Sequence, residues 1–146
     1  MIEYTGCGLP NIYLANGYAE IETPFGKSVS IDDVEGLHRA IGMEIVNREP
    51  TLSGQEFRFL RKELELSQDK LGGLLGRDSQ TIALWEKEKS DLPKMADMLL
   101  RAIYSEHLNE NVQIINMIER LNELDRIERD ERRFEFAETD DGWRAA

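Results

Sequence analysis

The 146-residue sequence has only one cysteine, Cys7, and only two histidines, His38 and His107. A single cysteine excludes an intrachain disulfide and a cysteine-ligated zinc cluster, and it shares no ligand spacing with either histidine. We therefore expect no bound metal. The serines are scattered and no motif places two carboxylates together, so we also expect a protein that is not an enzyme and that has no cofactor.

Long hydrophobic runs are also absent. No apolar stretch approaches the roughly 20 residues that a membrane-spanning helix needs, and the N-terminus lacks the basic-then-apolar pattern of a signal peptide. We expect no membrane association and a cytoplasmic protein. The length allows one good hydrophobic core, with or without a small appendage.

Positive charge is scarce, since the net charge is −11, but it is unevenly distributed. Residues 1–52 carry 3 basic and 8 acidic side chains (net −5), and residues 108–146 carry 6 and 11 (net −5). Residues 53–107 carry 9 and 10 (net −1). The middle segment is thus the part most compatible with a nucleic-acid partner, whereas acidic ends should repel DNA and suppress non-specific binding.

Residues 67–87 predict two short helices joined by a tight turn. Ser67 and Asp78 are good N-caps, because their side-chain oxygens can accept hydrogen bonds from early helical N–H groups. Gly76 follows the first helix, where a left-handed residue usually lies. The apolar residues recur at helical spacings, as on buried faces: Leu71, Leu74, Leu75, Ile82 and Trp85.

The outward face of the second predicted helix is short, polar and able to form hydrogen bonds. It consists of Ser79, Gln80, Thr81, Leu84 and Lys87. Such a face is compatible with the edge of a base pair.

The combined pattern Ser67-Gln68-x-x-Leu71, Leu75-Gly76 and Thr81-Ile82-x-x-Trp85-Glu86 resembles the helix-turn-helix of the Xre/Cro/phage-repressor family. The resemblance covers about residues 51–107. It implies that the second helix enters the DNA major groove, and that Arg61 and Glu86 form a structural ion pair. Together with the basic residues nearby, it implies this set of DNA-binding residues: Gln68, Arg77, Ser79, Gln80, Thr81, Leu84, Lys87 and Lys89. The alternative is a helix-turn-helix used only for packing or dimerisation.

The sequence departs from that family at several positions. Glu65 and Glu88 stand where the family usually has glycine, and Gly73 stands where a stronger helix former is common. Leu84 replaces a polar residue that often contacts bases, so it would contact a thymine methyl group or no base at all.

Residues 1–50 predict a small N-terminal module. Asn16-Gly17 predicts a hairpin turn that pairs Ile12 with Ile21 and Leu14 with Ala19. A second turn at 24–27 would complete a three-stranded antiparallel meander, which needs a helix against its apolar face. Capped by Asp32 or Asp33, the following helix offers such a stripe: Val34, Leu37, Ile41 and Ile45.

Residues 47–51 form a predicted linker, because Pro50 disfavours helix at Glu49. Ser53 and Glu56 form a predicted capping box for the next helix, and Pro93 begins a further helix that closes the domain. The predicted fold is mainly α: a five-helix-type helix-turn-helix domain (51–107) between the N-terminal β-meander and helix (1–50) and a C-terminal helical extension (108–146).

From Asn111 the pattern predicts another amphipathic helix, whose stripe favours a subunit interface over core packing. The stripe is Ile114, Met117, Ile118, Leu121 and Leu124. Residues 133–137 alternate like a strand, and we expect the tail 139–146 to be mobile. The aromatic residues Phe134, Phe136 and Trp143 either dock a partner or cover the core.

A second resemblance concerns the segment from Tyr4-Thr5-Gly6-Cys7-Gly8-Leu9 through Asp33-x-x-Gly36-Leu37-His38, which is similar to the front half of MqsA-like antitoxin regulators. Members that bind zinc use two Cys-x-x-Cys pairs. Only Cys7 is present here, so the resemblance does not imply zinc.

The sequence therefore favours a sequence-specific DNA-binding transcriptional regulator, a repressor that binds a palindromic operator as a homodimer. The alternative is an antitoxin that binds a partner protein and autoregulates its operon. An acidic chain would complement a basic toxin.

Overall fold

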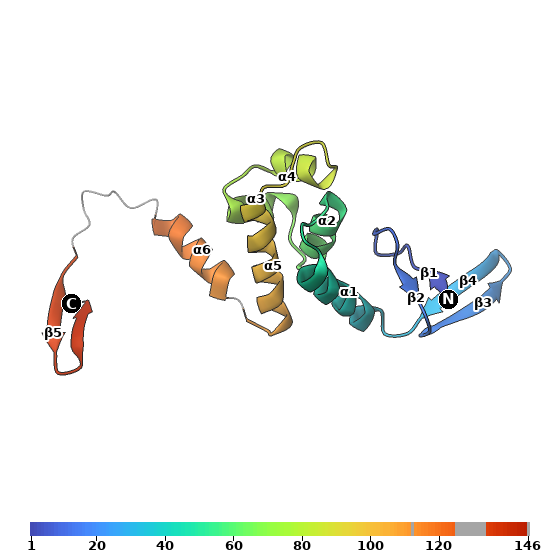
Figure 1. Ribbon diagram of the computed structural model, residues 1–146, viewed down its shortest axis with the longest axis horizontal. Helices are drawn as coiled ribbons and strands as arrows, with labels where there is room; N and C mark the ends of the chain where they lie inside the picture. Colours follow the sequence, from blue (N-terminus) through green and yellow to red (C-terminus); the bar gives the residue numbers. More distant parts are fainter. Residues whose placement is uncertain (112, 125–133, 146) are drawn as a thin grey trace.

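The structure is a computed structural model that describes residues 1–111, 113–124 and 134–145, which form six helices and three two-stranded antiparallel sheets (Figure 1). The strands are β1 (Ile2–Glu3), β2 (Tyr13–Leu14), β3 (Tyr18–Thr23), β4 (Gly26–Ile31), β5 (Phe136–Thr139) and β6 (Gly142–Ala145). The helices are α1 (Val34–Arg48), α2 (Gly54–Glu63), α3 (Gln68–Leu75), α4 (Ser79–Glu86), α5 (Lys94–Leu108) and α6 (Gln113–Leu124). The fold is thus mixed, with the helices at its centre and the sheets toward its ends.

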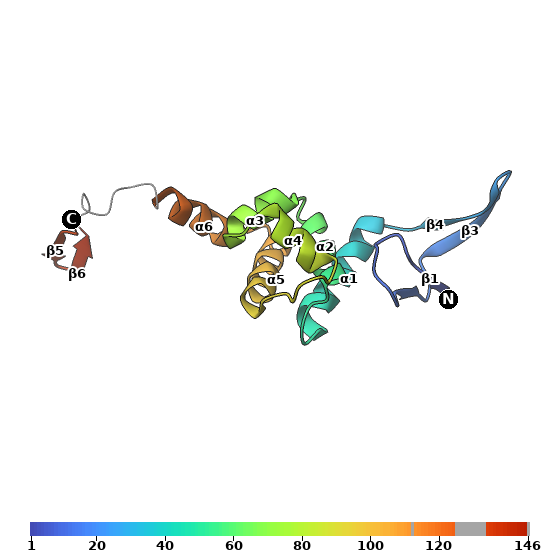
Figure 2. The ribbon, with the colours of Figure 1, turned by 90° about the horizontal axis from the view of Figure 1, so that it is seen from above.

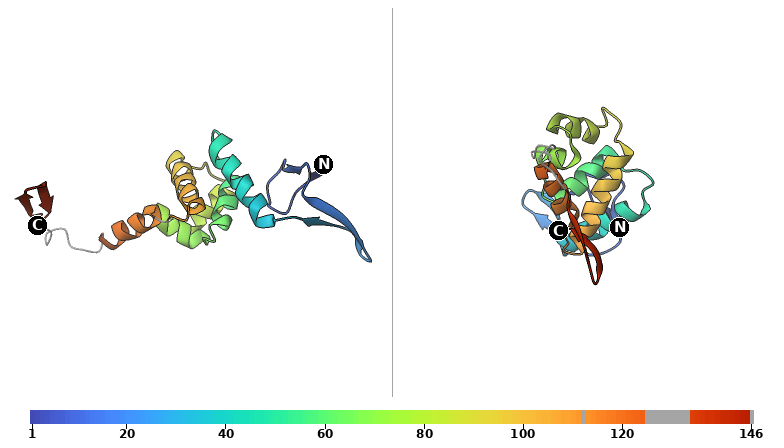
Figure 3. Two further views of the ribbon diagram at one scale, coloured as in Figure 1. Left: turned by 90° about the horizontal axis from the view of Figure 1, so that it is seen from below. Right: turned by 90° about the vertical axis from the view of Figure 1, so that its left-hand side faces the viewer.

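Helices α1 to α5 enclose the hydrophobic core, and they lie together between the N-terminal strands and the C-terminal hairpin (Figure 3, left). The largest fully buried side chains are Tyr104, Phe57, Leu60, Leu71, Ile82, Leu100 and Ile103. The rings of Phe57 and Trp85 meet edge to face with centroids 6.0 Å apart, a favoured aromatic geometry. Within the described residues, no helix combines the length and apolar character that crossing a membrane requires.

The predicted helix ends are confirmed. The side chains of Ser67 and Asp78 accept hydrogen bonds from backbone N–H groups of α3 and α4, and Ser53 forms the expected capping box with Glu56. Gly76 ends α3 in the left-handed conformation, with φ +70°. These short polar signals define where α2, α3 and α4 begin and how α3 ends.

The segment between α1 and α2 is held against α5. Glu49 is extended, as expected before Pro50, and its carbonyl oxygen accepts a 2.7 Å hydrogen bond from Arg101. Arg101 also pairs with the buried Asp97, which accepts a 2.9 Å hydrogen bond from the Leu52 N–H. Helix α1 therefore packs directly on the other helices, beside α2 and α5.

The predicted three-stranded meander is wrong in its first pairing, because β2 pairs with β1 and places Leu14 opposite Ile2. Its second part is confirmed, since the predicted turn at 24–27 joins β3 to β4 in an antiparallel hairpin. Gly17 has φ +79°, but its carbonyl oxygen accepts a 2.8 Å hydrogen bond from the Asp32 N–H at the base of the β3–β4 hairpin. Gly17 thus has the positive φ of a turn residue, but residues 16–17 do not join β2 and β3 in one sheet.

The β3–β4 hairpin also lacks the helix that was expected against it. Ile21 and Val29 remain 48% and 45% exposed. The register pairs Ile21 with Ser28 and Val29 with Glu20, so the two apolar residues lie on opposite faces and neither face is continuously apolar. Helix α1 buries Ile41 and Ile45 in the helical core instead, and the hairpin projects from the helices (Figure 2).

Helix α6 packs on α5 and α3, with Lys70 and Glu119 forming a 3.1 Å ion pair. Ile114 and Ile118 are half-buried, whereas Met117 and Leu121 are exposed. The stripe is therefore divided between packing on the helical core and an uncovered face; the Leu124 side chain lies outside the described part.

The expectation of a mobile tail at 139–146 requires correction, because β6 pairs with β5 from Phe136↔Ala145 to Thr139↔Gly142. The strand predicted at 133–137 is present from Phe136 onward, while residues 133 and 146 lie outside the described part. Phe134, Phe136 and Trp143 are 80%, 62% and 70% exposed. These aromatic residues therefore do not cover the core.

Candidate nucleic-acid interface

Helices α3 and α4 are joined by the three-residue segment 76–78. The Arg77 N–H donates a 2.8 Å hydrogen bond to the Gly72 carbonyl oxygen. A Cβ at residue 72 would lie 2.5 Å from the Arg77 carbonyl oxygen, so the turn approaches α3 more closely than any larger residue allows. The tight turn thus depends on a glycine inside α3.

Arg61 and Glu86 form the ion pair that the resemblance implies. Their side chains meet through Nε–Oε2 and Nη2–Oε1 contacts of 2.6 and 2.9 Å, and both residues are buried, at 8% and 6% exposure. Arg61 Nη1 also donates to the Leu66 carbonyl oxygen at 2.9 Å. This bidentate geometry fixes the end of α4 against α2 and the segment before α3.

Gln68 joins the same network. Its side-chain amide donates a 3.0 Å hydrogen bond to Glu86 Oε1, which places it beside the C-terminal end of α4. An eight-residue helix is about 12 Å long, so Gln68 does not gather with Ser79 and Gln80 at the other end.

The outward face of α4 is open. Gln80, Leu84 and Lys87 are exposed, while Ser79 and Thr81 are half-buried. Lys89 is exposed in the segment that follows. This face offers amide, hydroxyl and ammonium groups together with one aliphatic side chain.

Thr81 is occupied by the helix cap. Its hydroxyl and its backbone N–H each donate a 2.7 Å hydrogen bond to Asp78 Oδ1. These two hydrogen bonds hold the pKa of the Asp78 carboxyl below its ordinary value, and the one from the hydroxyl contributes more than the one from the backbone N–H. Both hydrogen-bond donors of Thr81 are therefore used to stabilise the N-terminal end of α4.

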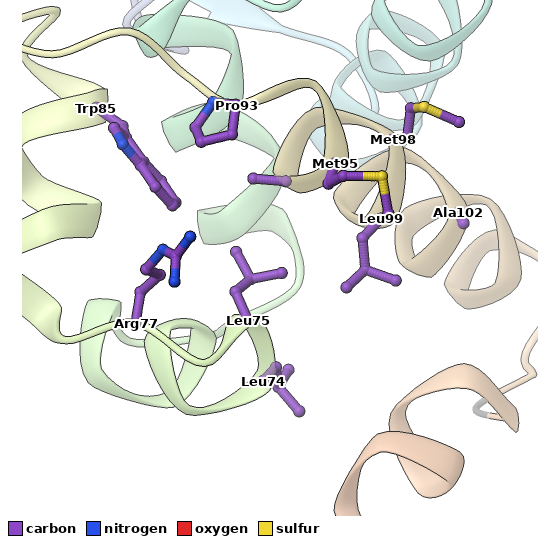
Figure 4. A pocket seen from close by; sticks show the side chains of 10 residues that line it. Leu74, Leu75, Arg77, Trp85, Pro93, Met95, Met98, Leu99 and Ala102 are labelled. Carbon is purple, nitrogen blue, oxygen red and sulfur yellow. The ribbon is translucent and has the colours of Figure 1, made fainter.

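Arg77 lines an apolar groove of about 460 Å³ between α3, α4 and α5. Figure 4 shows its guanidinium between Trp85 and Leu75. Arg77 is exposed and lies just before α4, so it lines this groove close to the start of the helix whose outward face the sequence grouped with it.

The sequence did not predict two structural contributions, the close approach of α2 to α4 at Gly54 and the hydrogen bond from Gly54 to Glu88. Gly54 lets α2 approach α4, since a Cβ there would collide with the carbonyl oxygens of Trp85 and Glu86. Its N–H donates a 3.1 Å hydrogen bond to Glu88 Oε1. Glu65 and Glu88 adopt left-handed conformations with φ +56° and +59°, a backbone geometry that glycine adopts with less strain.

His38, for which the sequence offered no metal-ligand spacing, has protein partners. His38 shares a 2.8 Å hydrogen bond with the Tyr4 hydroxyl and lies 3.3 Å from the Glu63 carboxylate. Burial, with further contributions from Cys7 and Glu63, raises the pKa of Tyr4. In the part of the chain that the structure describes, no three His, Cys, Asp or Glu side chains are grouped to hold a metal ion.

No protein-family model, curated protein or solved structure matches this chain.

Proposed function

We propose that this protein is a sequence-specific DNA-binding transcriptional regulator, a repressor in which α3 and α4 form a helix-turn-helix. The observation that carries the proposal is the division of α4 into two sides. One side is fixed by the buried Arg61–Glu86 pair and the core residues Ile82 and Trp85, and the other is exposed and polar. A rigid helix with an open polar face is what major-groove recognition requires.

The chemistry of the exposed side supports this role. The Gln80 amide can form two hydrogen bonds to adenine N6 and N7, and Leu84 can contact a thymine methyl group. Lys87 and Lys89 follow at the end of α4, where ammonium groups would meet phosphates. The side chains that face outward along α4 itself carry no carboxylate from Ser79 to Ala83.

The proposed active form is a homodimer on a palindromic operator. Two copies of α4 about 34 Å apart would enter successive major grooves on one side of the duplex. The two acidic end segments, each with net charge −5, would oppose non-specific binding by repelling phosphates.

Fluorescence anisotropy tests the proposal with labelled DNA from upstream of the gene, against unlabelled scrambled DNA at two salt concentrations. Binding that survives scrambled competitor supports the proposal. Equal loss to both competitors, or no binding at low salt, contradicts it. The salt dependence gives the number of phosphate contacts, because log K falls with log salt by about 0.9 per contact.

A second candidate is an antitoxin that binds a partner protein. It is favoured by the projecting β3–β4 hairpin, whose two outer edges are unpaired within the described residues and whose turn residue Phe25 is 99% exposed. Free strand edges can accept a strand from another protein. Glu20 and Glu22 add negative charge that suits a basic partner. Co-purification with the product of an adjacent reading frame tests this candidate, and failure to co-purify contradicts it.

A further inference from the structure

The C-terminal hairpin presents an aromatic face that nothing in the described part of the chain covers. Phe136 pairs with Ala145 and Glu138 pairs with Trp143. Residues two apart in a strand share a face, so Phe136, Glu138 and Trp143 lie together on one side. Phe134 precedes Phe136 by two positions and is also exposed. An isolated two-stranded hairpin is marginally stable in water, so a face of this kind needs a partner.

The helical core holds a complementary surface. The groove of Figure 4 is lined mainly by apolar side chains from α3 and α5, among them Leu74, Leu75, Met95, Met98 and Leu99. Met95 and Met98 are both largely exposed, and flexible methionines adapt well to aromatic rings. Arg77 is the charged residue that lines this groove, and within the described residues no ion pair engages it.

We propose that the aromatic face of β5–β6 docks in this groove of a second copy of the chain, with Glu138 paired to Arg77. The two surfaces match in kind: aromatic rings around one carboxylate meet aliphatic and methionine side chains around one guanidinium. Residues 134–145 also carry 4 acidic and 1 basic side chains, a net charge of −3. The paired charges would fix the orientation of the hairpin, and the rings would supply most of the affinity.

The area involved suits a second copy. Each aromatic side chain can bury roughly 150–250 Å², so the three exposed rings of one hairpin offer several hundred Å². Two exchanged hairpins with their two grooves then reach the roughly 1,200–2,000 Å² of a stable interface. The exchange is reciprocal, as two-fold symmetry requires. In the structure of the single chain, the β5–β6 hairpin stands apart from the groove, beyond α6 (Figures 1 and 2).

This inference rests on the proposed function only for the expectation of a homodimer, and its test omits DNA. Sedimentation velocity of the full chain over a concentration series measures the dimer dissociation constant. Trp143→Ala and Phe136→Ala should each weaken the dimer about tenfold or more. Phe25→Ala is the control, since it removes an exposed aromatic ring from the other hairpin and should leave the dimer unchanged.

Charge reversal provides the decisive arm. Arg77→Glu and Glu138→Arg should each weaken self-association, because both exchanged contacts then oppose like charges. An equimolar mixture of the two variants should form a heterodimer of near wild-type affinity, since each hairpin then meets a groove of opposite charge. The chain that carries both Arg77→Glu and Glu138→Arg should also regain wild-type self-association.

The proposal is overturned if the wild-type chain remains monomeric at high concentration or if Trp143→Ala dimerises like wild type. A third result also overturns it: the chain that carries both substitutions regains wild-type self-association, but the mixture of the two single variants does not. That result places the hairpin in the groove of its own chain. DNA binding is measured separately by anisotropy. A chain that fails to exchange hairpins yet discriminates operator from scrambled DNA contradicts this inference alone.

Discussion

The guanidinium of Arg61 and the carboxylate of Glu86 meet through hydrogen bonds of 2.6 and 2.9 Å in the interior of the protein, although the residues are 25 positions apart. Gln68 Nε2 adds a further hydrogen bond to the carboxylate, and the Leu66 carbonyl oxygen accepts one from the guanidinium. A buried ion pair is tolerated only when its remaining donors and acceptors are satisfied in this way. The network therefore sets the position of α4, which carries the proposed interface.

Removal of one partner of this pair should destabilise the fold severely. Arg61→Met or Glu86→Leu leaves a buried charge without its partner, at a cost of about 3–5 kcal/mol in the free energy of unfolding. The double variant should lose less than the sum of the two single losses, by more than about 1 kcal/mol. Urea denaturation measures all three values. Arg58→Met, an exposed arginine of the same helix, is the control and should change stability by less than about 0.5 kcal/mol.

Alanine substitutions at two adjacent glycines of α3, Gly72 and Gly73, should change the free energy of unfolding in opposite directions. At Gly73 an added Cβ meets nothing within 4 Å, so Gly73→Ala should raise the free energy of unfolding by about 1 kcal/mol through helix propensity. At Gly72 the Cβ would press on the Arg77 backbone, and overpacking of this kind costs about 1–3 kcal/mol. Thermal denaturation followed by circular dichroism should place the two variants on either side of wild type. A stabilised Gly72→Ala variant would show that the turn has room to move.

Glycine substitutions at the two left-handed glutamates, Glu65 and Glu88, should change the free energy of unfolding by different amounts. Left-handed backbone costs a residue with a Cβ about 1–2 kcal/mol, so Glu65→Gly should stabilise the protein by about 1 kcal/mol. Glu88→Gly relieves the same strain but removes the 3.1 Å hydrogen bond that Glu88 accepts from the Gly54 N–H, a contact worth about 1 kcal/mol. Its net effect should be near zero. Urea denaturation of both variants checks this, and equal stabilisation would mean that the Gly54 hydrogen bond contributes nothing.

The cap of α4 should make stability depend on pH in the acid range. Hydrogen bonds from Thr81 lower the pKa of Asp78 in the folded protein below its ordinary value of 3.8. A lowered folded pKa means that the unfolded chain binds the proton more readily. The contribution of Asp78 is therefore complete above the ordinary pKa and is lost as the pH falls through the lowered value. Urea midpoints of wild type and Asp78→Asn should converge as the pH falls through this range. A constant difference between the two midpoints would contradict the role of the carboxylate.

The features that the sequence predicted well depend on short-range chemistry. Ser53, Ser67, Asp78 and Gly76 act within one helical turn of their own positions, so residue type and spacing were enough to place them. The Arg61–Glu86 pair spans a longer distance, and it was predicted because a family resemblance supplied the tertiary arrangement.

The features that the sequence missed depend on competition between distant segments. Asn16-Gly17 carries a strong local hairpin signal, yet β1 lies beside β2 and the Asp32 N–H binds Gly17. Likewise, nothing local shows that Asp97 accepts a hydrogen bond from Leu52, which is 45 positions away. Such contacts are decided by which surfaces the whole chain can bury, and a single sequence does not reveal that choice.

Two variants of the proposed interface, Gln80→Ala and Lys89→Ala, distinguish base contacts made by α4 from sequence-independent attraction to phosphates. Gln80→Ala should cost about 1–3 kcal/mol of binding at one base position and reduce discrimination there, because the amide pairs with one base only. Lys89→Ala should weaken operator and scrambled DNA alike and reduce the salt slope by about 1. Anisotropy with a set of operators substituted one base pair at a time checks both variants. Gln55→Ala, an exposed glutamine on α2, is the matched control. If Gln80→Ala and Lys89→Ala give the same uniform loss across all sequences, α4 lies against the phosphate backbone and does not contact bases in the groove.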